Sequence, residues 1–105
     1  MILKYDANLE TDAIIVNLKR IINQTYKLLP NREEGSDWEK PLTTILEELA
    51  GMDRLLFGHH DLLFPVMCKL EGLFTLTEEE DFFLFRRTIF ECLGLMGDVV
   101  AACKN

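Results

Sequence analysis

Hydrophobic residues recur every three or four positions along four segments of the chain, and this spacing predicts four amphipathic helices. The first runs from Glu10 to Leu29, and the second from Asp37 or Lys40 to Gly58. The third is short, from Asp61 to Phe74, and the fourth follows Thr77 and continues nearly to the C-terminus. The expected inward positions of the first three are Ile14, Leu18, Ile21, Thr25 and Leu28; Trp38, Leu42, Ile45, Leu49, Met52 and Leu56; and Leu63, Met67, Leu70 and Phe74.

The breaks between these segments contain residues that begin or end helices. Pro30 is expected to end the first helix, because the residue before a proline avoids the helical conformation. Ser36 with Glu39, and Thr77 with Glu80, have the spacing of a capping box, which predicts a helix start at each pair. Residues 1–9 lack helical spacing, so they are interpreted as an N-terminal arm that packs on the bundle or a neighbour, or as a frayed end.

The fourth helix carries hydrophobic residues around most of its circumference. Its main row steps by three and four residues, and a second row lies beside it. The main row is Phe82, Phe85, Ile89, Cys92, Met96, Val99 and Cys103, and the second is Phe83, Phe90, Leu93 and Val100. A helix that is apolar nearly all round is buried on several sides, so this helix is expected to be central in the bundle or to form part of a dimer interface.

Small residues follow the aromatic ones on the same helix. Gly94, Gly97 and Ala101 would leave a strip free of bulky side chains, and another helix could approach the backbone closely there. The alternative is that the glycines only weaken the helix, at about 1 kcal/mol each. We favour close packing.

The length and composition indicate one all-α, four-helix bundle-like domain covering residues 1–105. The connections are short, which favours antiparallel neighbours. Hydrophobic residues make up 49% of the 105 residues, and a domain of this size has little interior relative to its surface. Part of the hydrophobic surface is therefore expected to meet another subunit, and a homodimer or a tight heteromeric subunit is predicted.

The net charge of −7 argues against nucleic acid and anionic membranes as partners, since both require a concentrated positive surface. The charge is uneven. Residues 1–32 hold five basic and three acidic residues, and the remainder of the chain therefore has a net charge of −9. The basic edge of the first helix, which includes Lys19, Arg20 and Lys27, is expected to pair with acidic residues of later helices within one chain or across a dimer.

The cysteines predict a cytoplasmic protein with reduced thiols. Cys68, Cys92 and Cys103 form no CxxC pair and no zinc-binding spacing, and each falls within a hydrophobic helical pattern. The first residues do not resemble a secretory signal. No cofactor is expected.

Two groups of residues suggest metal chemistry without completing a site. His59 and His60, followed by Asp61, contain good zinc ligands, and a metal-dependent hydrolase using both histidines is one alternative function. Adjacent histidines point in different directions, however, and an interhelical turn is the simpler interpretation.

Acidic residues on the second and fourth helices invite comparison with all-α nucleotide pyrophosphohydrolases, which bind magnesium through ExxE and ExxD motifs. Those residues are Glu47, Glu48, Asp53, Glu91 and Asp98. The spacing of both motifs fails here, because Ala50 or Gly51 and Gly94 stand where the second acids belong.

The densest acidic run, Glu78 to Asp81, includes Glu79 and Glu80 and fits a helix start. It also motivates a second alternative function, an acidic inhibitor or decoy of a nucleic-acid-binding protein, such as a phage or mobile element might use. The function we predict is a non-enzymatic protein–protein interaction or assembly module. Its expected interface residues are Phe83, Phe90, Gly94, Gly97, Ala101, Glu78, Glu79 and Glu80.

Overall fold

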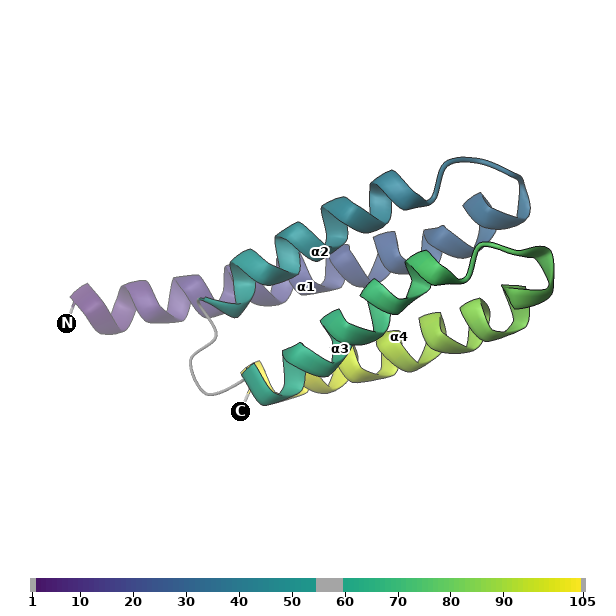
Figure 1. Cartoon of the computed structure of the whole chain (residues 1–105). Coiled ribbons are helices and arrows are strands. Elements are labelled where there is room, and N and C mark those ends of the chain that lie inside the picture. Colours follow the sequence, from purple (N-terminus) through teal and green to yellow (C-terminus); the bar gives the residue numbers. More distant parts are fainter. Residues whose placement is uncertain (1, 55–59, 105) are drawn as a thin grey trace.

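Four antiparallel α-helices form the molecule. The computed structural model describes the backbone of residues 2–54 and 60–104, and the side chains of residues 12–54 and 61–103. The helices are α1 (Ile2–Glu33), α2 (Glu39–Asp53), α3 (His60–Gly72) and α4 (Phe82–Lys104), with two short 3-10 helices, η1 (Leu73–Thr75) and η2 (Glu79–Asp81), between α3 and α4. They run alternately up and down along one long axis (Figure 1). The predicted all-α, four-helix bundle-like fold is confirmed.

Each helix occupies one corner of the bundle. α1 packs mainly against α2 and α4, and α3 packs mainly against the same two helices. The fourth helix therefore has two principal neighbours, as the other three do, and the prediction that it is central is wrong. A helix at a corner buries one broad stripe and leaves its opposite side to solvent or to another molecule.

The core is built from the hydrophobic rows that the spacing predicts. Ile14, Leu18, Ile21 and Leu28 of α1 are buried, as are Leu42, Ile45, Leu49 and Met52 of α2, and Phe85, Ile89, Cys92, Met96 and Val99 of α4. Thr25 lies in the same row of α1, and its hydroxyl donates a hydrogen bond to the Ile21 carbonyl at 2.8 Å. The row of α3 is different from the prediction. Val66 of α3 and Leu73 of η1 are fully buried, whereas Met67 of α3 and Phe74 of η1 are only partly buried beside the core.

The N-terminal residues continue α1 instead of forming a separate arm. The helix begins at Ile2, and its first turns extend beyond the ends of the other helices (Figure 1). The sequence before Pro30 contains no glycine or proline, so no residue in it interrupts the backbone hydrogen bonds of the helix. The boundary predicted at Glu10 is therefore wrong.

The other end of α1 also lies beyond its predicted boundary. Pro30 is inside the helix, which continues to Glu33. The chain then closes with a Schellman motif, in which the Ser36 amide donates to the Asn31 carbonyl at 2.8 Å and the Gly35 amide donates to the Arg32 carbonyl at 3.2 Å. Gly35 has a φ of +77°, a conformation that glycine adopts without steric cost.

Both predicted helix starts exist, but the capping residues differ by one position. Asp37, not Ser36, caps α2: its Oδ1 accepts hydrogen bonds from the amides of Glu39 and Lys40, at 3.0 and 3.2 Å. Before α4, the Glu78 amide donates to Asp81 Oδ2 at 3.2 Å, so the reciprocal pair is Glu78 and Asp81. Asp37 thus accepts the bonds that the Ser36 hydroxyl was expected to accept, and a carboxylate suits the positive end of a helix.

The connection between α2 and α3 is described only in part. The C-terminal end of α2 lies at Asp53, and the boundary predicted at Gly58 falls outside the described residues. α3 begins at His60, one residue before the predicted start at Asp61, so Asp61 lies in its first turn.

Candidate functional site

The outward side of α4 contains a regular row of residues that the bundle does not cover. Its spacing alternates between four and three positions, as in a helix that packs along another helix. We call it the α4 outer row, and its members are Phe83, Arg87, Phe90, Gly94, Gly97 and Ala101. All six are exposed. Phe83 retains 74% of its accessible surface and Phe90 retains 45%.

The helical period places this row opposite the core. The buried row of α4 contains Phe85, Ile89 and Met96, all fully inaccessible. At 3.6 residues per turn, Phe83 and Phe90 lie roughly 140–160° around the helix from Phe85. The predicted second hydrophobic row therefore separates into two parts: Val100 is buried, while Phe83 and Phe90 are exposed.

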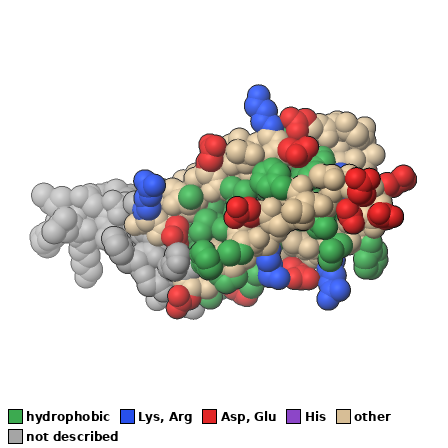
Figure 2. Space-filling model, viewed as in Figure 1, with side chains coloured by type: hydrophobic (Ala, Val, Ile, Leu, Met, Phe, Trp, Pro, Cys, Tyr) green, Lys and Arg blue, Asp and Glu red, His purple; other side chains and the backbone are tan. Residues whose placement is uncertain are grey.

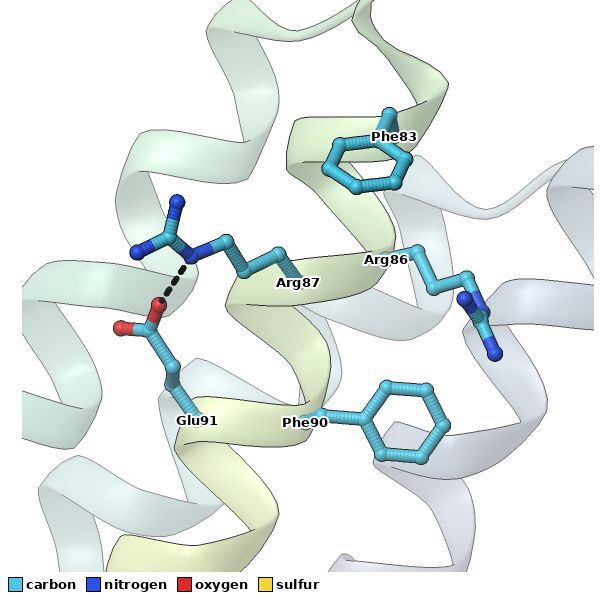
Figure 3. A pocket seen from close by; sticks show the side chains of 5 residues that line it. All are labelled: Phe83, Arg86, Arg87, Phe90 and Glu91. Carbon is cyan, nitrogen blue, oxygen red and sulfur yellow. Dashed lines mark ion pairs between the residues drawn. The ribbon is translucent and has the colours of Figure 1, made fainter.

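A shallow depression of about 610 Å³ lies on the N-terminal half of the outer row. It is lined by Phe83, Arg86, Arg87, Phe90 and Glu91 (Figure 3). The two arginines point to opposite sides of α4 (Figure 3). The Arg86 guanidinium lies 5.3 Å from the centre of the Phe90 ring. Arg87 Nε contacts Glu91 Oε1 at 3.3 Å, in an ion pair between residues four positions apart on the helix.

Glu91 joins α4 to α3. Its second oxygen accepts a hydrogen bond from Lys69 Nζ at 2.9 Å. The hydrogen bond and the charge of Lys69, assisted by Arg87, hold the pKa of the Glu91 carboxyl below its usual range, and the same contact raises the pKa of Lys69. Glu91 is therefore ionised and locally neutralised at neutral pH.

The hydrophobic surface continues from α4 onto α1. Tyr26, which is 53% exposed, meets Phe90 edge to face with ring centres 6.4 Å apart. Tyr26 follows the buried Thr25 on α1, and a helical period alone does not distinguish such a half-exposed position from a buried one. Together, Tyr26, Phe83 and Phe90 form an aromatic surface on the α1–α4 side of the bundle.

Gly94 and Gly97 of the outer row make no close contact with the described part of the chain. A Cβ atom added at Gly94 or at Gly97 would meet no heavy atom within 4 Å. A second depression, of about 440 Å³, lies beside Gly94 and is lined also by Lys69, Phe90, Glu91, Leu95 and Asp98. The backbone of α4 is accordingly accessible along its C-terminal half.

The acidic part of the predicted interface lies elsewhere. Glu78, Glu79 and Glu80 are exposed at the end of the bundle that holds the α1–α2 and α3–α4 connections, where acidic side chains gather (Figure 2). Glu78 also has a structural role, because its carbonyl accepts a 2.7 Å hydrogen bond from Arg32. These three residues precede the outer row and do not belong to it.

The predicted metal ligands do not form a described site. His59 lies outside the described residues, as does the side chain of His60. Within the part of the chain that the structure describes, no three His, Cys, Asp or Glu side chains converge in the manner of a metal site. Two of the acids compared with the pyrophosphohydrolase motifs have basic partners instead: Glu48 pairs with Arg20 at 2.6 Å, and Glu91 with Lys69.

The Arg20–Glu48 pair also confirms that the basic edge of α1 contacts an acidic residue of a later helix.

The three thiols have different environments. Cys92 is fully buried, and burial raises the pKa of its thiol to about 12. Burial also raises the pKa of Cys103, which is partly exposed. Cys68 is exposed, although it falls within the hydrophobic helical pattern of the third predicted helix. α3 begins its inward row at Leu63 and continues through Val66 and Leu70, which leaves Cys68 on the outer side.

The comparisons with known proteins identify no relative. The chain matches no protein-family model, no curated protein and no solved structure. None of the described helices has a hydrophobic stretch of the length needed to cross a membrane.

Proposed function

We propose that this protein is a non-enzymatic assembly module that self-associates through the α4 outer row. The observation that carries the proposal is the uncovered row itself, with two exposed phenylalanines followed by three small residues at a spacing suited to helix packing. Aromatic side chains exposed side by side mark interaction surfaces more often than isolated hydrophobic residues do.

The glycines provide independent support. Glycine in the middle of a helix costs about 1 kcal/mol relative to alanine. Neither Gly94 nor Gly97 is needed for contacts inside the chain, because a methyl group at either position would enter open space. Close approach of another helix would give both residues a role.

Sedimentation velocity or light scattering tests the proposal directly. A single pair of helices buries less than the standard interface of about 1,600 Å², so we expect a dissociation constant in the micromolar range. The double variant Phe83→Glu/Phe90→Glu should weaken self-association about 30-fold or more, because both aromatic anchors are replaced by charges.

A matched control adds the same charge to other exposed positions. Val16 lies on α1, and Ala50 on α2, the helix diagonal to α4; both are exposed. Val16→Glu/Ala50→Glu should self-associate as the wild type does. A wild-type chain that stays monomeric up to about 200 µM, well above a micromolar dissociation constant, would overturn the proposal.

A further inference from the structure

The α4 outer row is complementary to itself when one copy is reversed. We propose that its occupant is α4 of a second copy, running antiparallel, with the two-fold axis at the level of Cys92. This inference rests on the proposed self-association and adds the direction and register of the pair.

The complementarity is one of side-chain size. The three large residues of the row, Phe83, Arg87 and Phe90, all precede Cys92, and the three small residues all follow it. With a two-fold axis at Cys92, the two copies align by their distance from this residue. A residue that precedes Cys92 by n positions in one copy lies level with the residue that follows Cys92 by n positions in the other copy. Phe83 is then level with Ala101 of the second copy, Arg87 with its Gly97, and Phe90 with its Gly94.

Each level thus combines one large and one small side chain, which is the arrangement that fills space between closely packed helices. The depression beside Gly94 leaves room at the level of the Phe90 ring of the second copy. It is lined by Phe90, Gly94 and Leu95 together with the charged residues Lys69, Glu91 and Asp98. A parallel pair would instead oppose Phe90 to Phe90 and Gly94 to Gly94, and would leave the row overfilled at one end and empty at the other.

The charges beside the row agree with the same register. Arg87 and Asp98 are eleven residues apart, close to three full helical turns, so both lie on the same side of the row. A two-fold axis perpendicular to the helices places the same side of the row in both copies next to each other. Arg87 of each copy, whose side chain is 69% exposed, is therefore near Asp98 of the other.

Glu91 lies near the axis and would approach its own counterpart. This approach is tolerable because Lys69 and Arg87 of the same chain already neutralise each Glu91 carboxylate. Arg86 is on the opposite side of α4 (Figure 3), over the Phe90 ring, and takes no part in the charge pairing.

Disulfide cross-linking between two separately labelled chains tests the register. In a Cys68→Ser/Cys103→Ala background, which retains only the buried Cys92, one chain carries Phe83→Cys and the other Ala101→Cys. Residues 83 and 101 of one helix are about 27 Å apart, so no cross-link forms within a chain. In the cross-linked heterodimer, the chain with Ala101→Cys still has Phe83 and the chain with Phe83→Cys still has Ala101. One of the two Phe83–Ala101 contacts is therefore unchanged.

Under mild oxidation, the mixture should give a cross-linked heterodimer, and each chain alone should stay at least tenfold less cross-linked. Rapid cross-linking of the Phe83→Cys chain with itself would indicate a parallel pair and overturn the register. A wild-type dimer whose mixed variants give no cross-link would place the contact elsewhere and also overturn it. In both cases light scattering of the wild type reports separately on self-association.

Discussion

The guanidinium of Arg32 lies 4.7 Å from the centre of the Phe85 ring, at the end of the bundle that holds the α1–α2 and α3–α4 connections. The same group donates hydrogen bonds to the carbonyls of Leu76 and Glu78, at 2.8 and 2.7 Å. It also lies 6.0 Å from the Trp38 ring. One side chain at the end of α1 therefore contacts the residue before α2, the connection that precedes α4 and the first turn of α4 itself.

Replacing Arg32 should cost more stability than replacing another arginine of the same helix. Arg32→Ala removes two charge-assisted hydrogen bonds and contacts with aromatic rings, and we expect the free energy of unfolding to fall by about 2–4 kcal/mol. Arg20→Ala, which breaks an exposed ion pair with Glu48, should cost about 0.5 kcal/mol. Urea denaturation followed by circular dichroism measures both. Equal losses for the two variants would show that Arg32 has no special structural role.

Arg32 also explains why sequence patterns located the helices better than their ends. The inward rows of α1, α2 and α4 follow from helical period alone, and most of their predicted members are buried. Trp38, Phe82 and Cys103 are only partly buried, and Leu56 lies outside the described residues. Pro30 was expected to stop α1, yet the helix continues past it. The bonds of Arg32 to Leu76 and Glu78 are contacts between distant parts of the chain, and local sequence does not reveal them.

The predicted interface on α4 stays a prediction, although its two phenylalanines lie at the surface of the bundle. Spacing identified the two rows of α4, and Phe83 and Phe90 are indeed exposed. The abundance of hydrophobic residues predicts that part of them meets another subunit, but composition does not tell which residues are buried inside the chain and which lie on its outer side. The neighbours of α4 had to be known before its outer side could be recognised.

Gly35 should be intolerant of substitution, because its φ of +77° disfavours any residue with a side chain. We expect Gly35→Ala to lower the free energy of unfolding by about 1 kcal/mol, through strain in the Schellman motif that ends α1. Gly72→Ala is the control. Gly72 has a φ of −61° and open space around its Cα, so alanine there should be neutral or slightly stabilising. Thermal or urea unfolding of both variants distinguishes them, and an unaffected Gly35→Ala would contradict the proposed strain.

Cys92 should make the stability of the protein fall at alkaline pH. Burial raises the pKa of its thiol to about 12, with a smaller contribution from Glu91 that Lys69 opposes. In the unfolded chain the thiol ionises near its ordinary pKa of about 8.5–9. The stabilisation is therefore complete below about pH 8 and is lost as the pH rises towards 12, at up to about 1.4 kcal/mol per pH unit.

Comparison with Cys92→Val isolates this effect from the titration of other groups. The difference in unfolding free energy between the wild type and the variant should be constant from about pH 6 to pH 8, below the unfolded thiol pKa, and should shift against the wild type above about pH 9. A difference that stays constant to pH 10.5, between the two pKa values, would show that the thiol ionises without cost. Native alkylation at mildly alkaline pH should modify the exposed Cys68 well before Cys92.

Gly94 should have opposite effects on folding and on assembly. A methyl group at this position meets no atom within 4 Å in the single chain, so Gly94→Ala should raise the stability of the monomer by about 1 kcal/mol through its greater helix propensity. In the antiparallel pair, the same methyl group stands where the Phe90 ring of the second copy packs. Self-association should therefore weaken, by about tenfold for a loss of 1.4 kcal/mol.

Gly51→Ala separates these two effects. Gly51 is an exposed helical residue of α2, and a Cβ atom there also meets nothing within 4 Å. Its replacement should stabilise the chain to a similar extent while leaving self-association unchanged, since α2 is diagonal to α4. Urea unfolding at low protein concentration measures the first effect, and sedimentation velocity across a concentration series measures the second. If Gly94→Ala and Gly51→Ala behave alike in both measurements, the glycines of α4 do not mark a helix contact, and the aromatic residues alone would have to account for any dimer.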